Sequence, residues 1–333
     1  MVNSAIVVMG YICWFFIGLF ILKRVWKYLR RLKILDITKR WIVVTGCDSG
    51  IGAGLVTKLV AANASVIAFT YTEEGSKAAL KAGAKLAPCL DITDEASVLE
   101  ACTQVNDICD GQLWGIVHNA GVAQPGFIEF LQLEHYRRMM DVNFYAIVDL
   151  TQRLIPSVKA AGGRIVVVTS VDGIVSMPGN APYDAAKFAA EAYADALRVE
   201  LSFWNINVSV INPSTMRTPL AMNFFELERD TWDAMERLDP DGLWKQAWTR
   251  EWLEQHIAKN AENLERIAQD PKHATNDIFH ALAAKRPKMR YLSGTLAKTL
   301  IYALWIMPEH WSFAFKKLLI QPPPNTTLPD TKS

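Results

Sequence analysis

Residues 41–52 read WIVVTGCDSGIG, a short apolar run that leads directly into three closely spaced glycines. The β-branched residues of Trp41–Thr45 predict a buried strand, and a helical pattern begins after Gly52. Glycines between a strand and a helix let the backbone approach a pyrophosphate, whose charge the helix N-terminus attracts. The alternative is a tight turn that only requires positive φ angles. The position at the first strand-to-helix junction favours dinucleotide binding by Gly46, Asp48, Ser49, Gly50, Ile51 and Gly52.

The rest of the chain alternates short β-branched runs with longer helical patterns. Runs such as IVVVT (165–169) and VSVI (208–211) are apolar on both faces, which is typical of a parallel sheet covered by helices on each side. These units predict a doubly wound parallel α/β sheet of Rossmann type, in a single domain over residues 38–295. The other predicted strands are Ser65–Thr70, Lys85–Leu90, Leu113–His118, Arg164–Thr169, Ile206–Ile211 and Met289–Leu292, and the predicted helices include Asp94–Asn106, Leu133–Val158 and Ala181–Trp204.

The end of the second predicted strand distinguishes between the two nicotinamide dinucleotides. NAD binding usually places a carboxylate there for the ribose 2′-hydroxyl, and NADP binding places an arginine nearby. Thr70 and Tyr71 occupy this position, and neither Cys47–Ser49 nor Thr70–Thr72 contains a cation. Because Asp48 would repel a 2′-phosphate and a buried unpaired charge is costly, the sequence favours NAD, with NADP as the alternative.

Tyr183 and Lys187 lie one helical turn apart in YDAAK, directly after Pro182. Positions i and i+4 share one helix face, so the ammonium can lie near the phenol. The pKa of an unperturbed Tyr is about 10, and lowering it by about 3 units requires about 4 kcal/mol of preferential stabilisation of the phenolate. An ammonium and an oxidised nicotinamide ring together can supply this in a dry site, so that the phenolate takes the proton of an alcohol as hydride leaves. Alone, however, this spacing describes many solvated helix faces.

Three other segments bring polar groups to the same predicted edge of the sheet. Ser170 follows the strand Arg164–Thr169, where a hydroxyl can hold a substrate oxygen. The residues Asn119–Gly121 follow the strand Leu113–His118, at the carboxyl edge where open α/β sheets bind ligands. Asn143 lies within a long predicted helix, and a buried Asn requires hydrogen-bond partners.

Several motifs, taken in their order along the chain, resemble those of the short-chain dehydrogenase/reductase family. They are TGCDSGIG (45–52), HNAG (118–121), the set Ser170, Tyr183 and Lys187, and Asn212 with Pro213. The resemblance covers about residues 38–295. The phrases TGCDSG, TYTEEG (70–75) and HALAAKRPKMRY (280–291), together with an apolar N-terminus, are similar to the membrane-bound branch that contains retinol and hydroxysteroid dehydrogenases.

This resemblance implies roles for a catalytic set of four residues. Tyr183 would be the general acid/base, and Lys187 would lower its pKa and hold the nicotinamide ribose. Ser170 would orient the substrate oxygen, and Asn143 would anchor a water that links Lys187 to solvent.

The resemblance also implies further contacts with the cofactor. Asp91 would meet the adenine, Asn119 would brace the central strand, and Thr218 would contact the carboxamide. The remaining implied cofactor contacts are Thr70, Ala120, Gly121, Tyr183, Lys187 and Pro213.

Two positions depart from the family pattern. His118 stands where the family usually has Asn, and Ser214 stands where it usually has Gly. Neither residue belongs to the proton-transfer set, so we expect differences in packing and local backbone rather than loss of activity.

The N-terminal segment Ala5–Leu22 contains no charged residue. As a helix it is about 27 Å long, enough to cross the hydrocarbon core of a bilayer. The alternatives are a buried core helix and a cleaved signal peptide, which carries its basic residues before the apolar run. Here six basic residues follow it, within the predicted linker 23–37. We expect a single-pass anchor in the endoplasmic reticulum membrane, with the catalytic domain in the cytosol.

Composition excludes several classes of protein. The chain has 333 residues, with 35 Lys and Arg against 34 Asp and Glu. Without the six basic residues of the linker, 29 basic and 34 acidic side chains remain, a net charge of −5, so we expect no nucleic-acid partner. The five cysteines show no CxxC spacing and predict free thiols, and the six scattered histidines predict no metal site.

Two regions point to a lipophilic substrate and a membrane. Residues 221–285 form a helical region longer than an ordinary connection, which predicts a substrate-covering region. In it Trp244, Trp248 and Trp252 form one stripe at helical spacing, which fits packing on the sheet domain, a wall of a lipophilic pocket, or a face in the membrane. Residues 296–333 combine an amphipathic, Trp-bearing segment with a loose tail, and we expect this segment to lie at the membrane interface.

These observations predict an NAD(H)-dependent oxidoreductase that interconverts a lipophilic, steroid- or retinoid-like alcohol and its carbonyl. The alternatives are an NADP-linked ketoreductase of fatty acyl or sphingoid intermediates and a dinucleotide-binding membrane scaffold. A scaffold needs none of the four catalytic side chains, which argues against it. The family often dimerises through two long helices, here Leu133–Val158 and Ala181–Trp204, so a homodimer is also an expectation.

Overall fold

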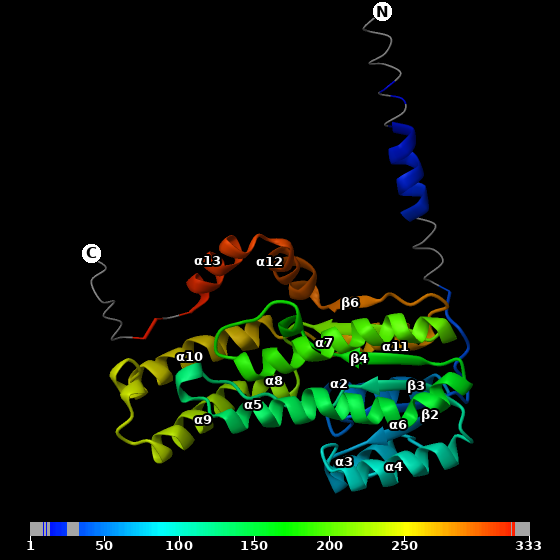
Figure 1. Ribbon diagram of the computed structural model, residues 1–333, viewed down its shortest axis with the longest axis horizontal. Coiled ribbons are helices and arrows are strands. Elements are labelled where there is room, and N and C mark those ends of the chain that lie inside the picture. Colours follow the sequence, from blue (N-terminus) through cyan, green and yellow to red (C-terminus); the bar gives the residue numbers. More distant parts are fainter. Residues whose placement is uncertain (1–8, 10, 12–13, 25–32, 321, 324–333) are drawn as a thin grey trace, which may run out of the picture.

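The β-branched runs form a sheet of six parallel strands in the computed structural model, which describes residues 9, 11, 14–24, 33–320 and 322–323. The strand order is β2-β1-β3-β4-β5-β6 (Figure 1). This confirms the predicted α/β fold with a parallel sheet. The strands are β1 (Trp41–Thr45), β2 (Ser65–Phe69), β3 (Leu113–His118), β4 (Arg164–Val168), β5 (Asn207–Pro213) and β6 (Arg290–Ser293).

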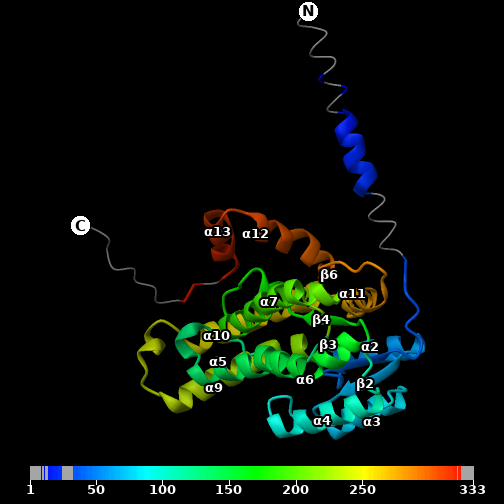
Figure 2. The same ribbon diagram turned by 45° about the vertical axis from the view of Figure 1, so that its right-hand side comes forward.

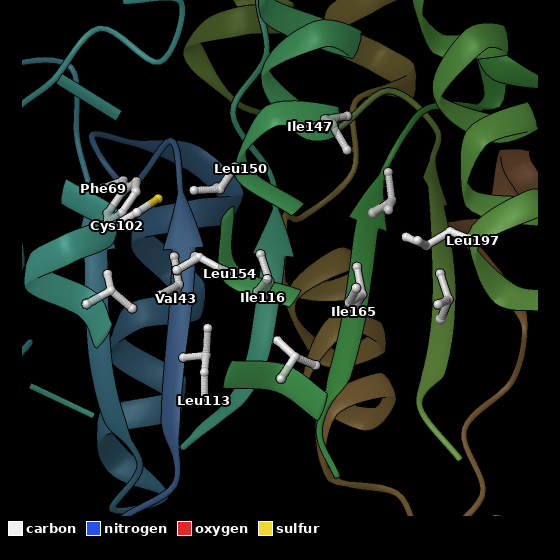
Figure 3. Packing of buried hydrophobic residues seen from close by; sticks show 14 of the residues in the cluster. Val43, Phe69, Cys102, Leu113, Ile116, Ile147, Leu150, Leu154, Ile165 and Leu197 are labelled. Atoms are coloured by element: carbon white, nitrogen blue, oxygen red, sulfur yellow. The ribbon is translucent and has the colours of Figure 1, made fainter. Parts of the chain in front are cut away.

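Successive residues of each strand pack into two different cores, one on each face of the sheet. Val43 and Ile116 face a core closed by α4 (Glu95–Ile108), α6 (Ala146–Ala160) and α7 (Ala181–Leu201) (Figure 3). Ile42 and Val117 face the opposite core, which is closed by α2 (Gly50–Ala61), α3 (Glu73–Lys81) and α11 (Lys272–Ala283). Burial of both faces explains why the strands are apolar throughout.

The chain reverses direction along the sheet at β1. Because β1 lies between β2 and β3, the connections after β1 and after β3 leave the sheet in opposite directions. This point is where open α/β sheets bind ligands, beyond the carboxyl ends of the strands. The glycine loop and the segment Asn119–Gly121 both follow these strand ends.

The predicted strand Lys85–Leu90 is wrong as a regular strand. The segment runs along β2 but forms only isolated bridges there, Ile67 with Leu86 and Thr70 with Cys89. Pro88 lies between these bridges and has no N–H to donate to a ladder, which interrupts the pairing.

The predicted helix Leu133–Val158 is interrupted in its middle. It consists of α5 (Leu133–Met140), a π-helical turn (Asp141–Tyr145) and α6. A π-helical turn contains a wider loop of backbone than an α-helix and is often found at functional sites. Asn143 lies at the centre of this turn and is fully buried.

The region between β5 and β6 contains four helices. α8 (Pro219–Met222), α9 (Phe224–Leu238) and α10 (Arg250–Ile267) extend beyond the strand ends, and α11 returns to pack on the sheet. The three tryptophans do not share one helix, since Trp244 lies in a 3₁₀ turn (Leu243–Gln246) and Trp252 in α10. They still converge, with Trp232 and Phe130, in one buried aromatic cluster.

The C-terminal segment continues from β6 into a π-helical turn (Ala297–Ile301), α12 (Tyr302–Ile306) and α13 (Glu309–Leu319). Both ribbon views place α12 and α13 on the same side of the molecule as the helical residues 14–24 (Figures 1 and 2). The predicted anchor Ala5–Leu22 and the linker 23–37 lie partly outside the described residues. In the part of the chain that the structure describes, no helix has the length and apolar content needed to cross a bilayer.

Candidate active site

The glycine loop is packed so closely that side chains are excluded from it. Gly46 and Gly50 have φ angles of +68° and +57°, in the left-handed region. A Cβ on Gly46 would lie 2.7 Å from the Cα of Ala120, and a Cβ on Gly50 would lie 3.0 Å from the Thr218 methyl group. The loop is therefore a bare backbone cradle that starts α2, as a pyrophosphate site requires.

Asn119 ties this loop to the end of β3. Its Nδ2 donates to the carbonyl oxygens of Thr45 and Gly46, at 3.0 and 3.1 Å. The Thr45 hydroxyl oxygen in turn accepts the backbone N–H groups of Asn119 and Ala120. The bracing role that the resemblance implies for Asn119 agrees with these contacts.

Asp48 occupies the end of β2, which the sequence alone did not reveal. Its carboxylate accepts the backbone N–H groups of Tyr71 and Thr72 at 2.9 Å each, and the Thr72 hydroxyl at 2.8 Å. Thr70 is buried and its hydroxyl donates to the carbonyl of Pro88. A carboxylate therefore stands at this strand end after all, contributed by the glycine loop rather than by β2.

The other candidate cofactor residues lie around the same edge. The exposed Asp91 carboxylate accepts the Thr93 N–H and hydroxyl, at 2.8 and 2.7 Å. Thr218 follows β5 and contacts Gly50. Pro213 ends β5, Ser49 precedes α2, and Ile51 is in its first turn.

The proton-transfer residues are held at the N-terminus of α7. Pro182 lies in its first turn, where the missing N–H has no cost. The Lys187 Nζ lies 5.4 Å from the centroid of the Tyr183 ring and donates to the Val168 carbonyl at 3.3 Å. Ser170, two residues after the end of β4, is close enough to Tyr183 to counteract the rise in the pKa of its phenol.

Asn143 forms a two-point clamp on the backbone after β3. Its Oδ1 accepts the Val122 N–H at 3.1 Å, and its Nδ2 donates to the Val122 carbonyl at 3.0 Å. A Cβ on Gly121 would lie 2.7 Å from Asn143 Oδ1 and 3.3 Å from Lys187 Nζ. Ala120 contacts Gly46 of the glycine loop, and the next residue, Gly121, lies against Asn143 and Lys187. These two consecutive residues therefore join the glycine loop to the proton-transfer residues.

Burial dominates the pKa values of the proton-transfer residues. Burial lowers the pKa of Lys187 to about 8, against the opposing attraction of Glu191 and Asp172. Burial, followed by repulsion from Asp172, raises the pKa of Tyr183. Burial and Asp172 therefore both oppose the phenolate in the protein alone, and the lowering of this pKa by Lys187 together with a bound oxidised nicotinamide stays a prediction.

Two carboxyl groups beside Tyr183, the buried Asp184 and the half-buried Asp172, escaped the sequence analysis. Burial raises the pKa of Asp172 to about 6, while Ser170 and Lys187 oppose this rise. Burial and then repulsion from Asp172 raise the pKa of Asp184 to about 8. Both residues are close in sequence to the catalytic set, but spacing alone does not distinguish a buried Asp from an exposed one.

A further polar network supports α7 one turn beyond Lys187. The Glu191 carboxylate accepts Thr169 Oγ1 at 2.6 Å and Asn212 Nδ2 at 2.5 Å, and pairs with Arg290 at 2.6 Å. Asn212 also donates to the Ser170 carbonyl at 2.9 Å. This network joins β4, β5, β6 and α7 directly beneath the site.

The two departures from the family pattern are local, as expected. His118 is buried and its Nε2 lies 2.9 Å from the Thr151 hydroxyl. Ser214 uses its hydroxyl to bond the Ser293 carbonyl of β6, at 3.2 Å.

Comparison with known proteins shows the relatives of the chain. The model of the short chain dehydrogenase family matches residues 40–229. Human retinol dehydrogenase 16 is 34% identical over 300 residues, which cover 88% of this chain and 92% of that protein. Human dehydrogenase/reductase SDR family member 9 is 33% identical, with 89% and 91% covered, and mouse 17-beta-hydroxysteroid dehydrogenase type 6 is 30% identical, with 89% and 94% covered.

Solved structures share the same fold. Levodione reductase superposes with a TM-score of 0.65 at 21% identity, covering 79% of this chain and 99% of that structure. A 3-ketoacyl-(acyl-carrier-protein) reductase from Brucella melitensis, solved with NADH, gives a TM-score of 0.54 at 27% identity, with 60% and 83% covered.

Proposed function

The chain belongs to the short-chain dehydrogenase family, in the branch of retinol and hydroxysteroid dehydrogenases, and we propose that it interconverts a lipophilic alcohol and its carbonyl with NAD. At the level of the family it is an oxidoreductase that acts on CH–OH groups. The observation that carries the proposal is the continuity of Ala120 and Gly121, which join the glycine loop to Asn143 and Lys187.

The mechanism follows from the positions of the side chains. Ser170 and Tyr183 present hydroxyls to a substrate oxygen, and Tyr183 exchanges a proton with it. Lys187 brings a positive charge to the phenol and holds the cofactor ribose, while Asn143 fixes the loop that faces both. When bound, an oxidised nicotinamide supplies the hydride acceptor and a second positive charge, which favours the phenolate.

The test of this mechanism is the variant Tyr183→Phe, which keeps the ring and removes the exchangeable proton. Nicotinamide absorbance is followed with all-trans-retinol, a 3α-hydroxysteroid and a 17β-hydroxysteroid as probes. We expect the variant to lose at least about a hundredfold in kcat, the lower end of acid/base catalysis. Tyr302→Phe, exposed on α12 and outside the cofactor and proton-transfer residues, is the matched control. If Tyr183→Phe retains wild-type turnover, the proposed mechanism is wrong.

The preference for NAD rests on Asp48. Its carboxylate already holds the backbone N–H groups of Tyr71 and Thr72. These donors would otherwise be available to a 2′-phosphate, and the carboxylate repels one. We expect NADH to bind at least about tenfold more tightly than NADPH, an effect of about 1.4 kcal/mol.

Cofactor binding is measured by quenching of protein fluorescence. Asp48→Asn removes the charge and should narrow the difference between the two cofactors, whereas Asp107→Asn, on α4, should not. Tighter binding of NADPH by the wild-type protein would support the NADP-linked ketoreductase instead.

The substrate is proposed to reach the site from a bilayer. Ile301 and Leu304 of the C-terminal segment pack against Val171 and Val175, in the loop directly after Ser170. From this attachment α12 and α13 present exposed apolar side chains beside basic ones, a composition typical of interfacial helices. The exposed residues include Trp305, Ile306, Trp311, Phe313 and Leu318, and the basic residues are Lys298, Lys316 and Lys317.

Membrane contact is tested with the full chain in vesicles of brominated phosphatidylcholine and phosphatidylserine. Bromine quenches tryptophan at the interface, so Trp311→Phe should remove part of the quenching. Trp244→Phe, buried in the aromatic cluster, should remove none. Equal quenching in wild type and Trp311→Phe contradicts this placement. Protease protection in microsomes then tests the proposed cytosolic orientation and endoplasmic reticulum anchor.

A homodimer remains a proposal of its own. α7 exposes Phe188 and Val199, which are 42% and 66% accessible, on the helix that the resemblance assigns to dimerisation. Val199→Arg should convert a dimer to a monomer in detergent, as measured by light scattering. A wild-type protein that is monomeric at all concentrations contradicts it.

A further inference from the structure

The segment that precedes β1 is paired with the segment that follows α11. Ile34 and Ala284 form an antiparallel bridge, and the Lys285 N–H donates to the Lys33 carbonyl at 2.7 Å. Both ribbon views show the blue segment before β1 beside the orange loop before β6 (Figures 1 and 2). The described end of the linker is therefore fixed to the domain at this loop, residues 284–289.

The backbone of this loop is hydrogen-bonded to the domain, which leaves its side chains in solvent. The Lys288 N–H donates to the Tyr291 hydroxyl at 2.9 Å, and the Lys288 carbonyl accepts the Ser209 hydroxyl at 2.8 Å. The Met289 carbonyl accepts the Val210 N–H at 2.9 Å. The exposed side chains of the loop are Lys285, Arg286, Lys288 and Met289.

The pairing of linker and loop gathers four basic side chains, which we call the basic patch: Lys33, Lys285, Arg286 and Lys288. All four are exposed. Within residues 14–24, 33–320 and 322–323, none of the four forms an ion pair. Their charges are therefore available to a partner outside the chain.

Two carboxylates near the patch already have basic partners of their own. Arg40 attracts the Asp36 carboxylate. Asp195 is paired with Arg198, which donates to the Met289 carbonyl at 3.3 Å. The patch is thus positive, although the chain beyond residue 33 has 29 basic and 34 acidic side chains, a net charge of −5.

We infer that the basic patch binds the anionic headgroups of the membrane and so fixes which side of the domain faces the bilayer. The inference rests on the proposed N-terminal anchor. Ten residues separate Leu22 from Lys33, so the anchor holds the patch within about 40 Å of the bilayer. An anionic surface repels a domain of negative net charge except where its basic groups gather.

The patch and the C-terminal helices lie along the same edge of the sheet. β6 is the last strand in the sheet order, the loop 284–289 precedes it, and the segment with α12 and α13 follows it. Both ribbon views place α12 and α13 beyond this edge (Figures 1 and 2). Residues 278–308 contain no Asp or Glu. One bilayer surface can therefore meet the patch with its headgroups and the apolar side chains of α12 and α13 with its interface.

The opposite edge of the sheet provides matched controls. β2 is the strand at that edge, and α3 packs beside it. Three exposed lysines lie on α3 and just after it: Lys77, Lys81 and Lys85. Leu80 on α3 is 48% exposed, against 68% for Met289 in the loop. Each change at the patch therefore has a counterpart of equal charge or similar exposure far from it.

The experiment maps lipid contact with the full chain inserted in vesicles of phosphatidylcholine, with or without phosphatidylserine. Met289→benzoylphenylalanine places a photocrosslinker at the patch, and Leu80→benzoylphenylalanine places one at the opposite edge. We expect position 289 to crosslink to lipid in the anionic vesicles and position 80 not to. High salt should lower the crosslinking at position 289, because it shortens the range of electrostatic attraction.

Neutral variants then test the role of the patch itself. The triple variant Lys285→Gln, Arg286→Gln, Lys288→Gln should lower crosslinking at position 289 at least about fivefold, because three attractive charges are lost. The triple variant Lys77→Gln, Lys81→Gln, Lys85→Gln should leave it unchanged. Both should keep a cooperative thermal transition and wild-type turnover in detergent, since none of the six residues belongs to the active site.

The outcomes separate the inference from the proposals beneath it. Extraction of the chain from vesicles by alkaline carbonate contradicts the proposed anchor, and the inference with it. A retained chain that crosslinks at position 289 equally in neutral and anionic vesicles, or in neither, contradicts the inference alone. An equal loss of crosslinking in both triple variants also contradicts it, because the effect would then be a general response to lost charge.

Discussion

Single residues in this protein take their charge states mainly from burial. Lys187 is 3% exposed, and its described hydrogen bond goes to a neutral carbonyl rather than to a carboxylate. Glu191 and Asp172 attract it, yet burial still lowers its pKa to about 8. A buried ammonium of this kind is retained for chemistry more than for stability.

Lys187→Met is therefore expected to separate activity from stability. Alcohol oxidation should fall at least about a hundredfold, because the phenolate loses its cation. The free energy of unfolding should stay within about 1 kcal/mol of wild type, since relief of burial offsets the lost attraction. Kinetics and urea denaturation measure the two quantities, with the exposed Lys272→Met as control. Wild-type kcat in Lys187→Met contradicts the assignment.

His118 gives a prediction about acid stability. Burial lowers its pKa to about 3, so between that value and 6.5 the unfolded chain binds a proton that the folded chain does not. The stability that neutral His118 provides is complete above pH 6.5 and is lost as the pH falls. The loss is about 1.4 kcal/mol per pH unit.

His118→Asn should remove this loss, since Asn does not titrate. The unfolding free energy of the variant minus that of wild type should increase as the pH is lowered from 6.5 to 4.5. The same difference should stay constant between pH 7 and 8. Parallel curves over the whole range contradict a neutral buried imidazole.

Many residues of the site could be predicted from the sequence, and the features that could not be predicted have physical explanations. The three glycines, Tyr183 and Lys187 belong to short local patterns. The role of Asp48 was hidden because its partners, Tyr71 and Thr72, lie more than twenty residues later, in the loop between β2 and α3. The pKa of Tyr183 depends on burial, which no spacing encodes.

At the scale of elements, the predicted helices differ from the observed ones at irregular turns. A period of 3.6 residues describes α5 and α6 well, but it does not reveal the π-helical turn between them. Similarly, three tryptophans at helical spacing suggested one helix, although Trp244 lies in the 3₁₀ turn Leu243–Gln246 and α10 begins only after its N-cap, Thr249. Each error arose where the side chains keep a regular helical spacing in the sequence although the backbone departs from a regular α-helix.

The interface of α9 and α10 provides a further prediction. Glu228 is 2% exposed, and burial raises the pKa of its carboxyl to about 7. His256 Nε2 lies 3.7 Å away, but burial lowers its pKa, so it offers no charge at neutral pH. Because the folded state holds the proton more tightly, stability falls as the pH rises from about 4.5 through 7.

Glu228→Gln should relieve this penalty. We expect it to raise the free energy of unfolding by roughly 1–3 kcal/mol at pH 8 and to have little effect at pH 4. Denaturation at both pH values tests the prediction, with Glu251→Gln, exposed on α10, as control. Equal effects of Glu228→Gln at the two pH values would falsify it.

On the scale of the whole molecule, the parallel sheet and its two helical layers were predictable, because the strands are buried on both faces. The attachment of the C-terminal segment was not, since it depends on contacts between residues more than a hundred positions apart. Ile301 and Leu304 rest on the loop that follows Ser170. The C-terminal helices and the site are thus parts of one structure.

This attachment predicts how the enzyme responds to substrate in membranes. With the full chain in vesicles, the initial rate should follow the mole fraction of retinol or steroid in the bilayer rather than its total concentration. Replacing Phe313 and Leu318 with Asp should raise the apparent KM about threefold or more, because apolar contact with lipid is lost. Phe203→Asp, exposed at the end of α7, is the control. A dependence on total concentration contradicts the prediction.

The π-helical turn Asp141–Tyr145 also has a consequence for mutation by deletion. Loss of one residue there would let the backbone close into an ordinary α-helix. The helix that follows would keep its phase, because the wide turn holds one residue more than an α-helical turn, so the ridge of Ile147, Leu150 and Leu154 would still face the sheet. The contact of Asn143 with the backbone of Val122 would be lost. An in-frame loss of a single codon in this stretch should therefore impair activity more than folding.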